Sequence, residues 1–537
     1  MRRFSWDKIA SVATRTANSL NIFQAISRRH ARMQFEADLQ SIMPHSKSLV
    51  SQPLLLDGTW DNPNYWLRVQ LLLSALGIQK GQVQGLLGSY NVQQQTATMR
   101  RMGVLGFHYL SDSNGKKISA KAEALWENLE NASEILEWEL PHKLPQALLY
   151  DYILKRQRLE TVCIHDTNGA LYVSEFLEAA KTADKMFASS PISLFIASHA
   201  VGATSVWIWV ALKYGIKVIV PFGYAGLCRY WSLHKPTDIF EFGDRIARND
   251  MESLPAAQQI ALEQCGEQEV ARRIEGITNN LGASYAFREN SLEVNKQEIC
   301  EQFGWEISRP IVAFYSSNWF DYPHSFGMNR FLDHWDLIQA VVEAAKLQKK
   351  VNWLIKGHPC DAWYGSVDFR KLMADAETAH IKITQQLWGG AGLLKAIDAF
   401  VTCHGTVGVE AAALGKPVLV AERGWYDQAG FVRTSDSRED FLELLVSQWW
   451  TEIPLAKTTR KARQFAGLYW GRPDWQAGFL MSDDSRQWEI YQDGKQLIRG
   501  NMEVIDQELD WIRNWYQSEH PYYHVYKMLG TSKYAVD

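Results

Sequence analysis

The sequence has few of the features that mark a disulfide-stapled, zinc-binding or membrane-spanning protein. Six cysteines are scattered over 537 residues, and none forms a C-x-x-C pair. Such cysteines are typical of the reduced thiols of a cytosolic protein. No apolar run reaches the roughly 18 residues of a membrane-spanning helix, and the N-terminus has no apolar signal-peptide core. We therefore expect a cytoplasmic protein.

An excess of charge of one sign is also missing. The chain carries 56 Lys and Arg against 60 Asp and Glu, for a net charge of -4. This balance provides no field for binding a nucleic acid. Metal-binding patterns are equally scarce, because the sequence has no H-E-x-x-H motif and no D-x-D pair at the end of an expected strand. We expect no nucleic-acid partner, no cofactor and no catalytic metal.

The sequence does contain enough apolar material for two cores. Hydrophobic residues make up 46% of the chain and charged residues 22%, which excludes intrinsic disorder. A compact domain usually spans about 100–200 residues, so a chain of this length is expected to form at least two. The 22 tryptophans suit sugar rings as well as core packing.

Residues 1–34 form a basic segment with interleaved apolar residues. Seven Lys and Arg stand there against a single acid, Asp7. Two interpretations fit this pattern. The segment either makes a peripheral contact with an anionic membrane surface, or it is a helix packed on the body with a solvated basic face.

From residue 48 onward, apolar runs of strand length alternate with segments of helical period, as in a parallel sheet covered by helices on both faces. In the first half, the expected strands are Ser48–Leu56, Thr161–His165, Ile192–Ala197 and Ile216–Val220. Helices are expected to begin near Asn62, Tyr172 and Thr204. The polar stretch of residues 282–309 marks the expected domain boundary.

The alternation is cleaner after this boundary. Strands are expected at Ile311–Tyr315, Asn352–Ile355, Ala399–Cys403 and Pro417–Ala421, with helices at Asn329–Leu347, Phe369–Ala376 and Val407–Leu414. This order predicts an α/β protein of GT-B architecture, with two Rossmann-like domains facing a cleft. The expected domains are residues 1–290 and 291–503. Residues 504–537, with an amphipathic helix at 504–517, are expected to cross back onto the first domain.

Ligands of such sheets bind beyond the carboxyl ends of the strands, so the residues that follow each strand are the candidates for chemistry. Ser317 and Asn318 follow the first strand of the second domain. Lys356 and His358, in the tetrapeptide KGHP, follow the next one and can donate hydrogen bonds to phosphate oxygens, while Pro359 fixes the backbone. A purely structural turn is the alternative interpretation of KGHP.

The run CHGTVGVEAAALGKP, residues 403–417, adds a second group of candidates. Thr406 stands at the expected N-cap of a helix, where the N–H groups of Val407 and Gly408 would form an anion site. Glu410 lies one turn further and is placed to accept hydrogen bonds from a sugar hydroxyl. The alternative is a capped helix with a solvated glutamate.

The two runs NWLIKGHP, residues 352–359, and CHGTVGVEAAALGKPVLVAERGWYDQAGF, residues 403–431, resemble the capsule polysaccharide biosynthesis family of bacterial glycosyltransferases. That family includes Kdo transferases. The clear resemblance covers roughly residues 310–432. It implies a nucleotide-sugar donor in the second domain and a glycan acceptor on the side of the first.

By this resemblance, Lys356 and His358 would hold the donor phosphate, and Thr406 with Glu410 would hold the nucleotide or its sugar. The run His404-Gly405-Thr406 stands where several relatives carry a Ser-Ser or Ser-Thr pair, which leaves the donor nucleotide open. The expected donor-binding residues are Ser317, Asn318, Lys356, His358, His404, Thr406 and Glu410.

Inverting sugar transfer needs a group that takes the proton of the acceptor hydroxyl, and in a two-domain cleft the first domain usually supplies it. Asp57 and Asp61 resemble the acidic loop of Kdo-transferring relatives and are preferred, followed by Asp166 and then His199. Asp61 has the alternative role of a helix N-cap, and His199 that of a hydrogen-bonded histidine at a strand end.

Three functions compete on this basis. The preferred one is transfer of a sugar, such as a CMP-activated ulosonic acid of the Kdo type, to a bacterial surface polysaccharide. Nucleotide-sugar 2-epimerases share the architecture and the H-P element, but they usually carry a paired Glu where this chain has Glu410 followed by Ala411. The third is a non-catalytic glycan-binding or scaffold protein of a polysaccharide export complex.

Overall fold

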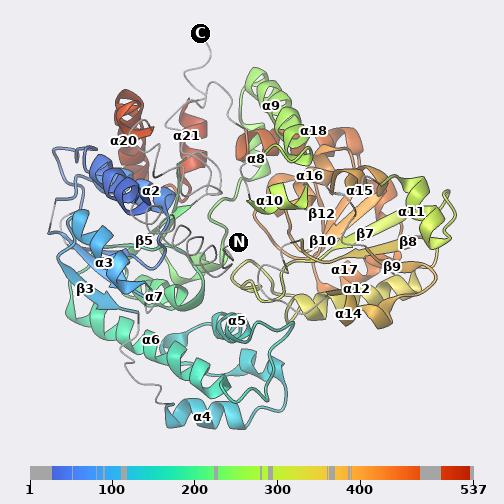
Figure 1. The fold of residues 1–537 in the computed structure, drawn as a ribbon, viewed down its shortest axis with the longest axis horizontal. Helices are drawn as coiled ribbons and strands as arrows, with labels where there is room; N and C mark the ends of the chain where they lie inside the picture. Colours follow the sequence, from blue (N-terminus) through green and yellow to red (C-terminus); the bar gives the residue numbers. More distant parts are fainter. Residues whose placement is uncertain are drawn as a thin grey trace, which may run out of the picture.

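The computed structural model describes residues 27–50, 53–79, 81–88, 91–110, 118–222, 228–278, 281–287, 294–359, 361, 369–384, 388, 390–471, 491 and 497–531. They form two α/β domains side by side, each built on a six-stranded sheet (Figure 1). Most of the basic segment 1–34 lies outside the described residues, and its last part belongs to a helix spanning residues 27–39. None of the described helices combines the length and apolar character needed to cross a membrane.

The first sheet has the strand order β3-β2-β1-β4-β5-β6. Its strands are β1 (Leu54–Asp57), β2 (Val83–Leu87), β3 (Gly106–Tyr109), β4 (Leu194–Ile196), β5 (Lys217–Phe222) and β6 (Arg229–Leu233). All neighbouring strands pair in parallel except β5 and β6. Numbered along the chain, this is the 3-2-1-4-5-6 order of a Rossmann domain.

Helices cover both faces of this sheet, and the first of them shows how they begin. Asn62 caps α2, because its side chain accepts hydrogen bonds from the N–H groups of Asn64 and Tyr65, and Pro63 follows at the first helical position. The helices of the first domain are α2 (Pro63–Ala75), α3 (Val92–Arg101), α4 (Ala120–Glu127), α5 (Gln146–Gln157), α6 (Gly169–Ser189) and α7 (Gly202–Lys213). The next helix, α8 (Arg248–Glu252), contributes Met251 to the core of the second domain.

The strand expected at Thr161–His165 does not form. The side-chain amide of Gln157 takes the place of a neighbouring strand, since it accepts from the Cys163 N–H and donates to the Cys163 carbonyl, both at 2.9 Å. The backbone N–H and carbonyl of Cys163 therefore form their hydrogen bonds with a nearby side chain and need no neighbouring strand. The sheet is completed instead by the short β2 and β3, whose polar residues, such as Gln84 and His108, concealed them in the sequence.

The second sheet repeats the same topology. Its order is β12-β11-β10-β7-β8-β9, and all its neighbours pair in parallel. Its strands are β7 (Ile311–Tyr315), β8 (Asn352–Lys356), β9 (Ile381–Ile383), β10 (Ala399–Thr402), β11 (Val418–Val420) and β12 (Arg433–Thr434). The first, second, fourth and fifth of these match the expected strands to within one residue at each end.

The helices that pack in the second domain include α8 and three more helices that precede its sheet in the chain. Glycines allow α9 and α18 to pack closely, because a Cβ at Gly266 would lie 1.8 Å from the Arg463 carbonyl oxygen. The helices on both sides of residue 290 thus join the core of the second domain. The helices of this domain are α9 (Ala256–Ile274), α10 (Leu281–Ala286), α11 (Lys296–Phe303), α12 (His334–Leu347), α14 (Phe369–Leu372), α15 (Gly390–Ala396), α16 (Val407–Ala413), α17 (Arg438–Val446) and α18 (Leu455–Tyr469).

Short 3-10 helices connect these elements. They are η1 (Ala132–Glu137), η2 (Pro141–Lys143), η3 (Pro236–Phe240), η4 (Ala374–Ala376), η5 (Asp427–Ala429) and η6 (Trp449–Glu452).

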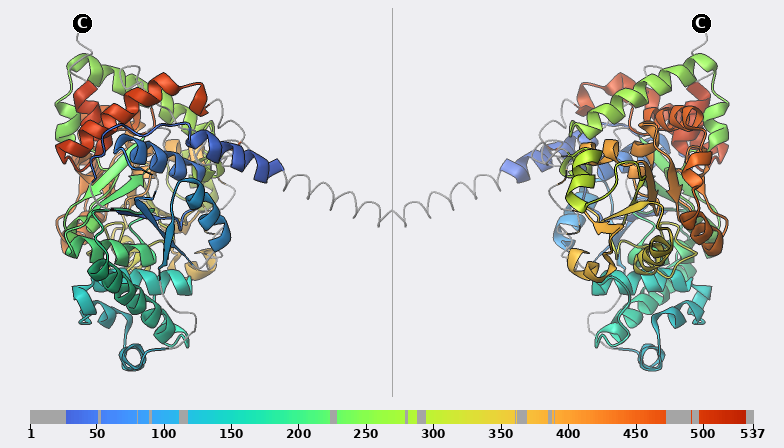
Figure 2. Two further views of the ribbon diagram at one scale, coloured as in Figure 1. Left: turned by 90° about the vertical axis from the view of Figure 1, so that its left-hand side faces the viewer. Right: turned by 90° about the vertical axis from the view of Figure 1, so that its right-hand side faces the viewer.

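The chain crosses back to the first domain at its end. Helix α20 (Met502–Ser518) packs on α2 (Figures 1 and 2). Helix α21 (Tyr523–Thr531) packs on β6. Ile505 and Trp515 of α20 are buried in the same core as Leu54 of β1. Two Rossmann-like domains with a returning C-terminal helix define the GT-B fold, so the expected fold class is confirmed.

A polar contact between the domains fixes how their sheets face each other. Asp151 on α5 accepts hydrogen bonds from the N–H groups of His324 and Ser325, at 3.1 and 2.7 Å, in the loop after β7. The neighbouring Tyr150 donates its hydroxyl proton to Asp333, the N-cap of α12, at 2.6 Å. These groups are buried, so the contact is shielded from water. It holds the carboxyl ends of the two sheets next to one another.

Candidate functional site

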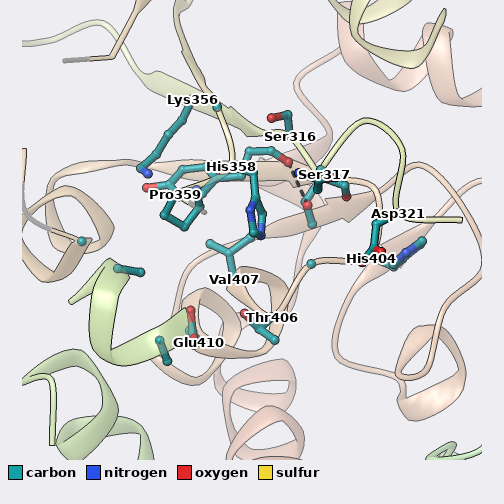
Figure 3. Close-up of a pocket in the computed structure, with 18 of the residues that line it drawn as sticks. Ser316, Ser317, Asp321, Lys356, His358, Pro359, His404, Thr406, Val407 and Glu410 are labelled. Atoms are coloured by element: carbon teal, nitrogen blue, oxygen red, sulfur yellow. Dashed lines mark hydrogen bonds between the residues drawn. The ribbon is translucent and has the colours of Figure 1, made fainter. Parts of the chain in front are cut away.

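A cavity of about 370 Å³ lies at the carboxyl ends of the second-domain strands (Figure 3). We call it the polar cavity. The loops after β7, β8 and β10 form its walls together with α9 and α16. All seven residues expected to bind the donor line it, namely Ser317, Asn318, Lys356, His358, His404, Thr406 and Glu410.

The location follows from the topology. In a sheet of order 3-2-1-4-5-6, the chain leaves the first and fourth strands in opposite directions, which opens a crevice between them. In the second domain these strands are β7 and β10, and the loops after them carry Ser317 and His404. Residues that are distant in the sequence therefore lie together at the carboxyl edge of the second sheet.

Glycine at position 408 is required by the turn after β10. A Cβ there would lie 2.2 Å from the Tyr426 hydroxyl oxygen, which instead donates a hydrogen bond to the Gly405 carbonyl at 2.7 Å. The Gly408 N–H is bonded to the same carbonyl at 3.0 Å. The expectation that this N–H points outward to an anion is therefore wrong. Thr406, at the N-cap position, makes no side-chain capping bond.

The histidines of the polar cavity are neutral at pH 7. Burial, reinforced by the charge of Lys356, lowers the pKa of His358 to about 4, and burial lowers the pKa of His404 to about 4 as well. A neutral imidazole can still donate one hydrogen bond. Lys356 and Arg273 are the cationic side chains among the described residues that line this cavity.

Arg273 was not expected from the sequence. It lies on α9 and forms a buried ion pair with Glu410. Its Nε and Nη2 atoms lie 3.2 and 3.1 Å from Oε1 of Glu410. Its guanidinium stacks over the Trp470 ring at 4.1 Å. One oxygen of Glu410, which we expected to bind a hydroxyl, is thus engaged by an arginine. No local pattern distinguishes Arg273 from the exposed Arg272 beside it.

Asp361 is a second residue that the sequence interpretation missed, although it stands only three positions after His358. Burial raises its pKa to about 7. Its Oδ1 accepts a hydrogen bond from the side-chain amide of Asn318 at 3.2 Å. This carboxyl group therefore titrates near neutral pH beside residues that line the polar cavity.

A second cavity, of about 290 Å³, adjoins the first at the interface between the domains. We call it the aromatic cavity. Trp60, Ser198 and His199 line it from the first domain, while Trp425 and Tyr469 line it from the second. The two cavities share Phe326, His404, Thr406 and Trp425.

His199 is the candidate base that lines the aromatic cavity. Its ring is 4.2 Å from the Trp60 ring, measured between centroids, and its Nδ1 is 3.2 Å from the Ser198 hydroxyl. That hydroxyl donates to Asp57. Because the hydroxyl has a single proton, Nδ1 of His199 must be the donor in the bond with Ser198, which selects the tautomer with the proton on Nδ1.

Asp57 lies behind this pair and is fully buried. Its carboxylate accepts hydrogen bonds from the N–H groups of Thr59 and Ser198, at 2.8 and 2.9 Å, in addition to the Ser198 hydroxyl. It lines neither cavity. Asp57 thus links the end of β1 to the end of β4 through hydrogen bonds.

Asp61 is held by a different set of groups. Arg32 donates to both of its oxygens at 2.7 Å, and Gln94 and Trp66 donate at 2.7 and 3.0 Å. Burial alone would raise the pKa of Asp61, but these bonds outweigh burial and lower it. The suggested role of Asp61 as an N-cap is wrong, since Asn62 caps α2.

Asp166 lies apart from both cavities, just before α6. Its side chain accepts from the Asn168 N–H at 2.9 Å, which makes a local turn. Within the part of the chain that the structure describes, no group of three or more His, Cys, Asp or Glu residues is placed to hold a metal ion.

No protein-family model matches the chain, and a search of curated proteins also returns no match. Solved structures with a similar fold include Anabaena HepE in complex with UDP, with 12% identity over 78% of this chain and 96% of that one and a TM-score of 0.27. Thermosulfurimonas dismutans KpsC, a β-Kdo 2,4 transferase, is 14% identical over 48% of this chain and 78% of that one, with a TM-score of 0.29.

The UDP-GlcNAc 2-epimerase of Neisseria meningitidis, bound to UDP-GlcNAc, gives 12% identity over 84% of this chain and all of that one, with a TM-score of 0.22. Transferases and epimerases thus both occur among these structures. At such identities and TM-scores, the likeness assigns no activity to this chain.

Proposed function

We propose that the protein is a nucleotide-sugar glycosyltransferase. The observation that carries this proposal is the pair of adjoining cavities. A transferase must bind two substrates in contact, whereas a 2-epimerase acts on one. The polar cavity offers donors for phosphate, and the aromatic cavity, lined by both domains, continues from it past His404 and Thr406.

On the donor side, Lys356 supplies positive charge and His358 supplies a neutral hydrogen-bond donor to the phosphate of the departing nucleotide. Ser317, Asn318 and Thr406 provide further polar contacts. In keeping with the KGHP motif, the proposed donor is a CMP-activated ulosonic acid of the Kdo type, and the acceptor is a bacterial surface polysaccharide.

On the acceptor side, His199 is the proposed base. With its proton on Nδ1, the imidazole can receive the proton of an acceptor hydroxyl on Nε2. Ser198 and Asp57 hold the ring in that tautomer and orientation. The same role suits Asp61 less well, because a carboxylate with a lowered pKa is a weak base.

The epimerase remains the second candidate function because of the shared architecture. Two observations count against it. The helix α16 carries one glutamate, Glu410, followed by Ala411, and one oxygen of that glutamate is engaged by Arg273.

A panel of nucleotides read by thermal shift tests the donor side. A fitting nucleotide at a hundredfold excess over its Kd stabilises the protein by about 2.7 kcal/mol, and we expect CMP to give the largest shift. His358→Ala should reduce that shift and slow transfer by about 10²- to 10³-fold. His165→Ala, an exposed position outside both cavities, is the matched control. A folded His358→Ala variant with normal nucleotide binding and transfer would remove the donor-site assignment.

A further inference from the structure

The aromatic cavity has a distinctive lining. Six aromatic side chains contribute to it, namely Trp60, Trp231, Phe242, Phe326, Trp425 and Tyr469. Among the described residues that line it, there is no lysine and no arginine. The polar cavity next to it has one of each. The two neighbouring cavities therefore favour ligands of different charge and polarity.

The two acidic residues that line the aromatic cavity, Glu241 and Asp244, already have partners. Glu241 pairs with Arg245 and lies 3.6 Å from Arg423. Asp244 is buried, accepts the hydroxyl proton of Tyr469 at 2.6 Å and is attracted by Arg229. An anionic group in this cavity would meet two carboxylates and no lysine or arginine on the surface that surrounds it. A carboxylate that is desolvated without a partner is strongly disfavoured.

The aromatic rings are held in place from both domains. Trp60 packs against His199, the proposed base. Trp425 donates its indole N–H to the His404 carbonyl at 3.2 Å, and its ring lies 4.4 Å from the Tyr469 ring. Fixed aromatic faces suit a ligand with an apolar face and polar edges. A pyranose ring has this character, because its C–H bonds gather on one face and its hydroxyls point outward.

The volume also limits the ligand. About 290 Å³ lies near the lower end of the roughly 300–1,000 Å³ range of small-molecule pockets. The cavity thus has room for a small unit at the end of a chain, and a longer acceptor would extend out of it.

We propose that the acceptor places a neutral pyranose ring in the aromatic cavity, and that acceptors ending in a uronic or ulosonic acid are rejected there. This inference rests on the proposed function and narrows its acceptor class. Under this proposal the two substrates differ in charge, since the anionic donor lies beside Lys356 and the neutral acceptor beside Trp60 and Trp425.

The test is ligand-observed NMR with matched pairs of sugars on the full-length protein. The probes are the methyl β-pyranosides of glucose and galactose and the corresponding methyl uronides, in which a carboxylate replaces the terminal CH2OH group. We expect at least one neutral pyranoside to bind, with its uronide weaker by at least about tenfold, since that ratio needs only about 1.4 kcal/mol. A uronide that binds as well as its neutral partner, or four probes that all fail to bind, would overturn the proposal.

Variants connect the result to the cavity. Trp60→Ala should abolish binding of the neutral sugar, whereas Trp450→Ala, a half-buried tryptophan that lines neither cavity, should leave it unchanged. Glu241→Gln removes a carboxylate from the cavity lining, and with it a partner of Arg245 and Arg423, and should strengthen uronide binding. If Trp60→Ala fails to fold, the comparison of uronide binding by Glu241→Gln and by the wild type tests the proposal. Unchanged uronide binding by folded Glu241→Gln, or unchanged sugar binding by folded Trp60→Ala, contradicts the proposal.

The result separates this inference from the proposed function. Binding of a neutral pyranoside in the absence of any transfer would retain the sugar site and refute the transferase. Transfer that proceeds best to a uronide would retain the transferase and refute the neutral acceptor.

Discussion

Asp361 shows how burial changes the chemistry of a single side chain in this site. Its pKa is raised to about 7, above the roughly 3.9 of an aspartate in an unfolded chain. The folded state therefore binds more protons than the unfolded state between these two values. The stability that Asp361 contributes is present below about pH 4 and is lost as the pH rises through 7.

Asp361→Asn should remove this loss. Because Asn carries no charge, the variant is expected to gain stability relative to the wild type as the pH rises from 5 to 8, by at most roughly 3 kcal/mol. Urea denaturation at several pH values measures the difference, with the exposed Asp375→Asn as the control. A stability difference that stays constant over this pH range would show that Asp361 is ionised in the folded protein.

The residues of the polar cavity could be predicted from the sequence because each follows an apolar strand. Lys356 and His358 come directly after one such run, and His404 and Thr406 after another. Asp57 stands at the end of its strand as predicted, but it lines neither cavity, and its role depends on Ser198, which lies 141 residues away. Arg273 and the pairing of Asp61 with Arg32 depend on tertiary contacts that no local pattern records.

At the scale of elements, the buried pair of Arg273 and Glu410 links α9 to α16 across the polar cavity. A buried ion pair adds little net stability, but removing one partner leaves an uncompensated charge. The link therefore makes the position of α16, and with it Thr406, sensitive to a helix far away in the sequence.

Arg273→Met should lower the free energy of unfolding by about 3–5 kcal/mol, and adding Glu410→Met to it should restore a large part of that loss. Arg272→Met is the matched control, because the neighbouring arginine is exposed and pairs with Glu269 on the same helix. Urea denaturation of the four proteins makes the comparison. Arg273→Met and Arg272→Met of equal stability would exclude a stabilising link between the helices.

Elements of the second domain were predicted well because their buried strands are continuous apolar runs, such as IVAFY in β7. The short strands β9 and β12 escaped notice because only three and two residues pair. In the first domain, the apolar run at 161–165 predicts a strand that does not form. A pattern of side chains does not reveal that Gln157 bonds the backbone N–H and carbonyl of Cys163.

At the scale of the whole molecule, both domains have the same strand order, so their crevices lie at equivalent places. The contact between α5 and the loop after β7 sets these crevices next to each other, and the two cavities meet there. The sequence predicted the two domains and the returning helix. It did not predict the second cavity, because that cavity is formed by side chains from both domains.

The most direct test follows the sugar itself. A sugar ester of the nucleotide that the thermal-shift panel selects is labelled in its sugar and incubated with the protein and a neutral glycan acceptor. The products are then separated and identified by mass spectrometry. A transferase moves the label into covalent linkage with the acceptor, and we predict that product, with its formation reduced by about 10²- to 10⁴-fold in His199→Ala. Label that stays on the nucleotide while its sugar changes configuration at C2 would identify an epimerase and contradict the account.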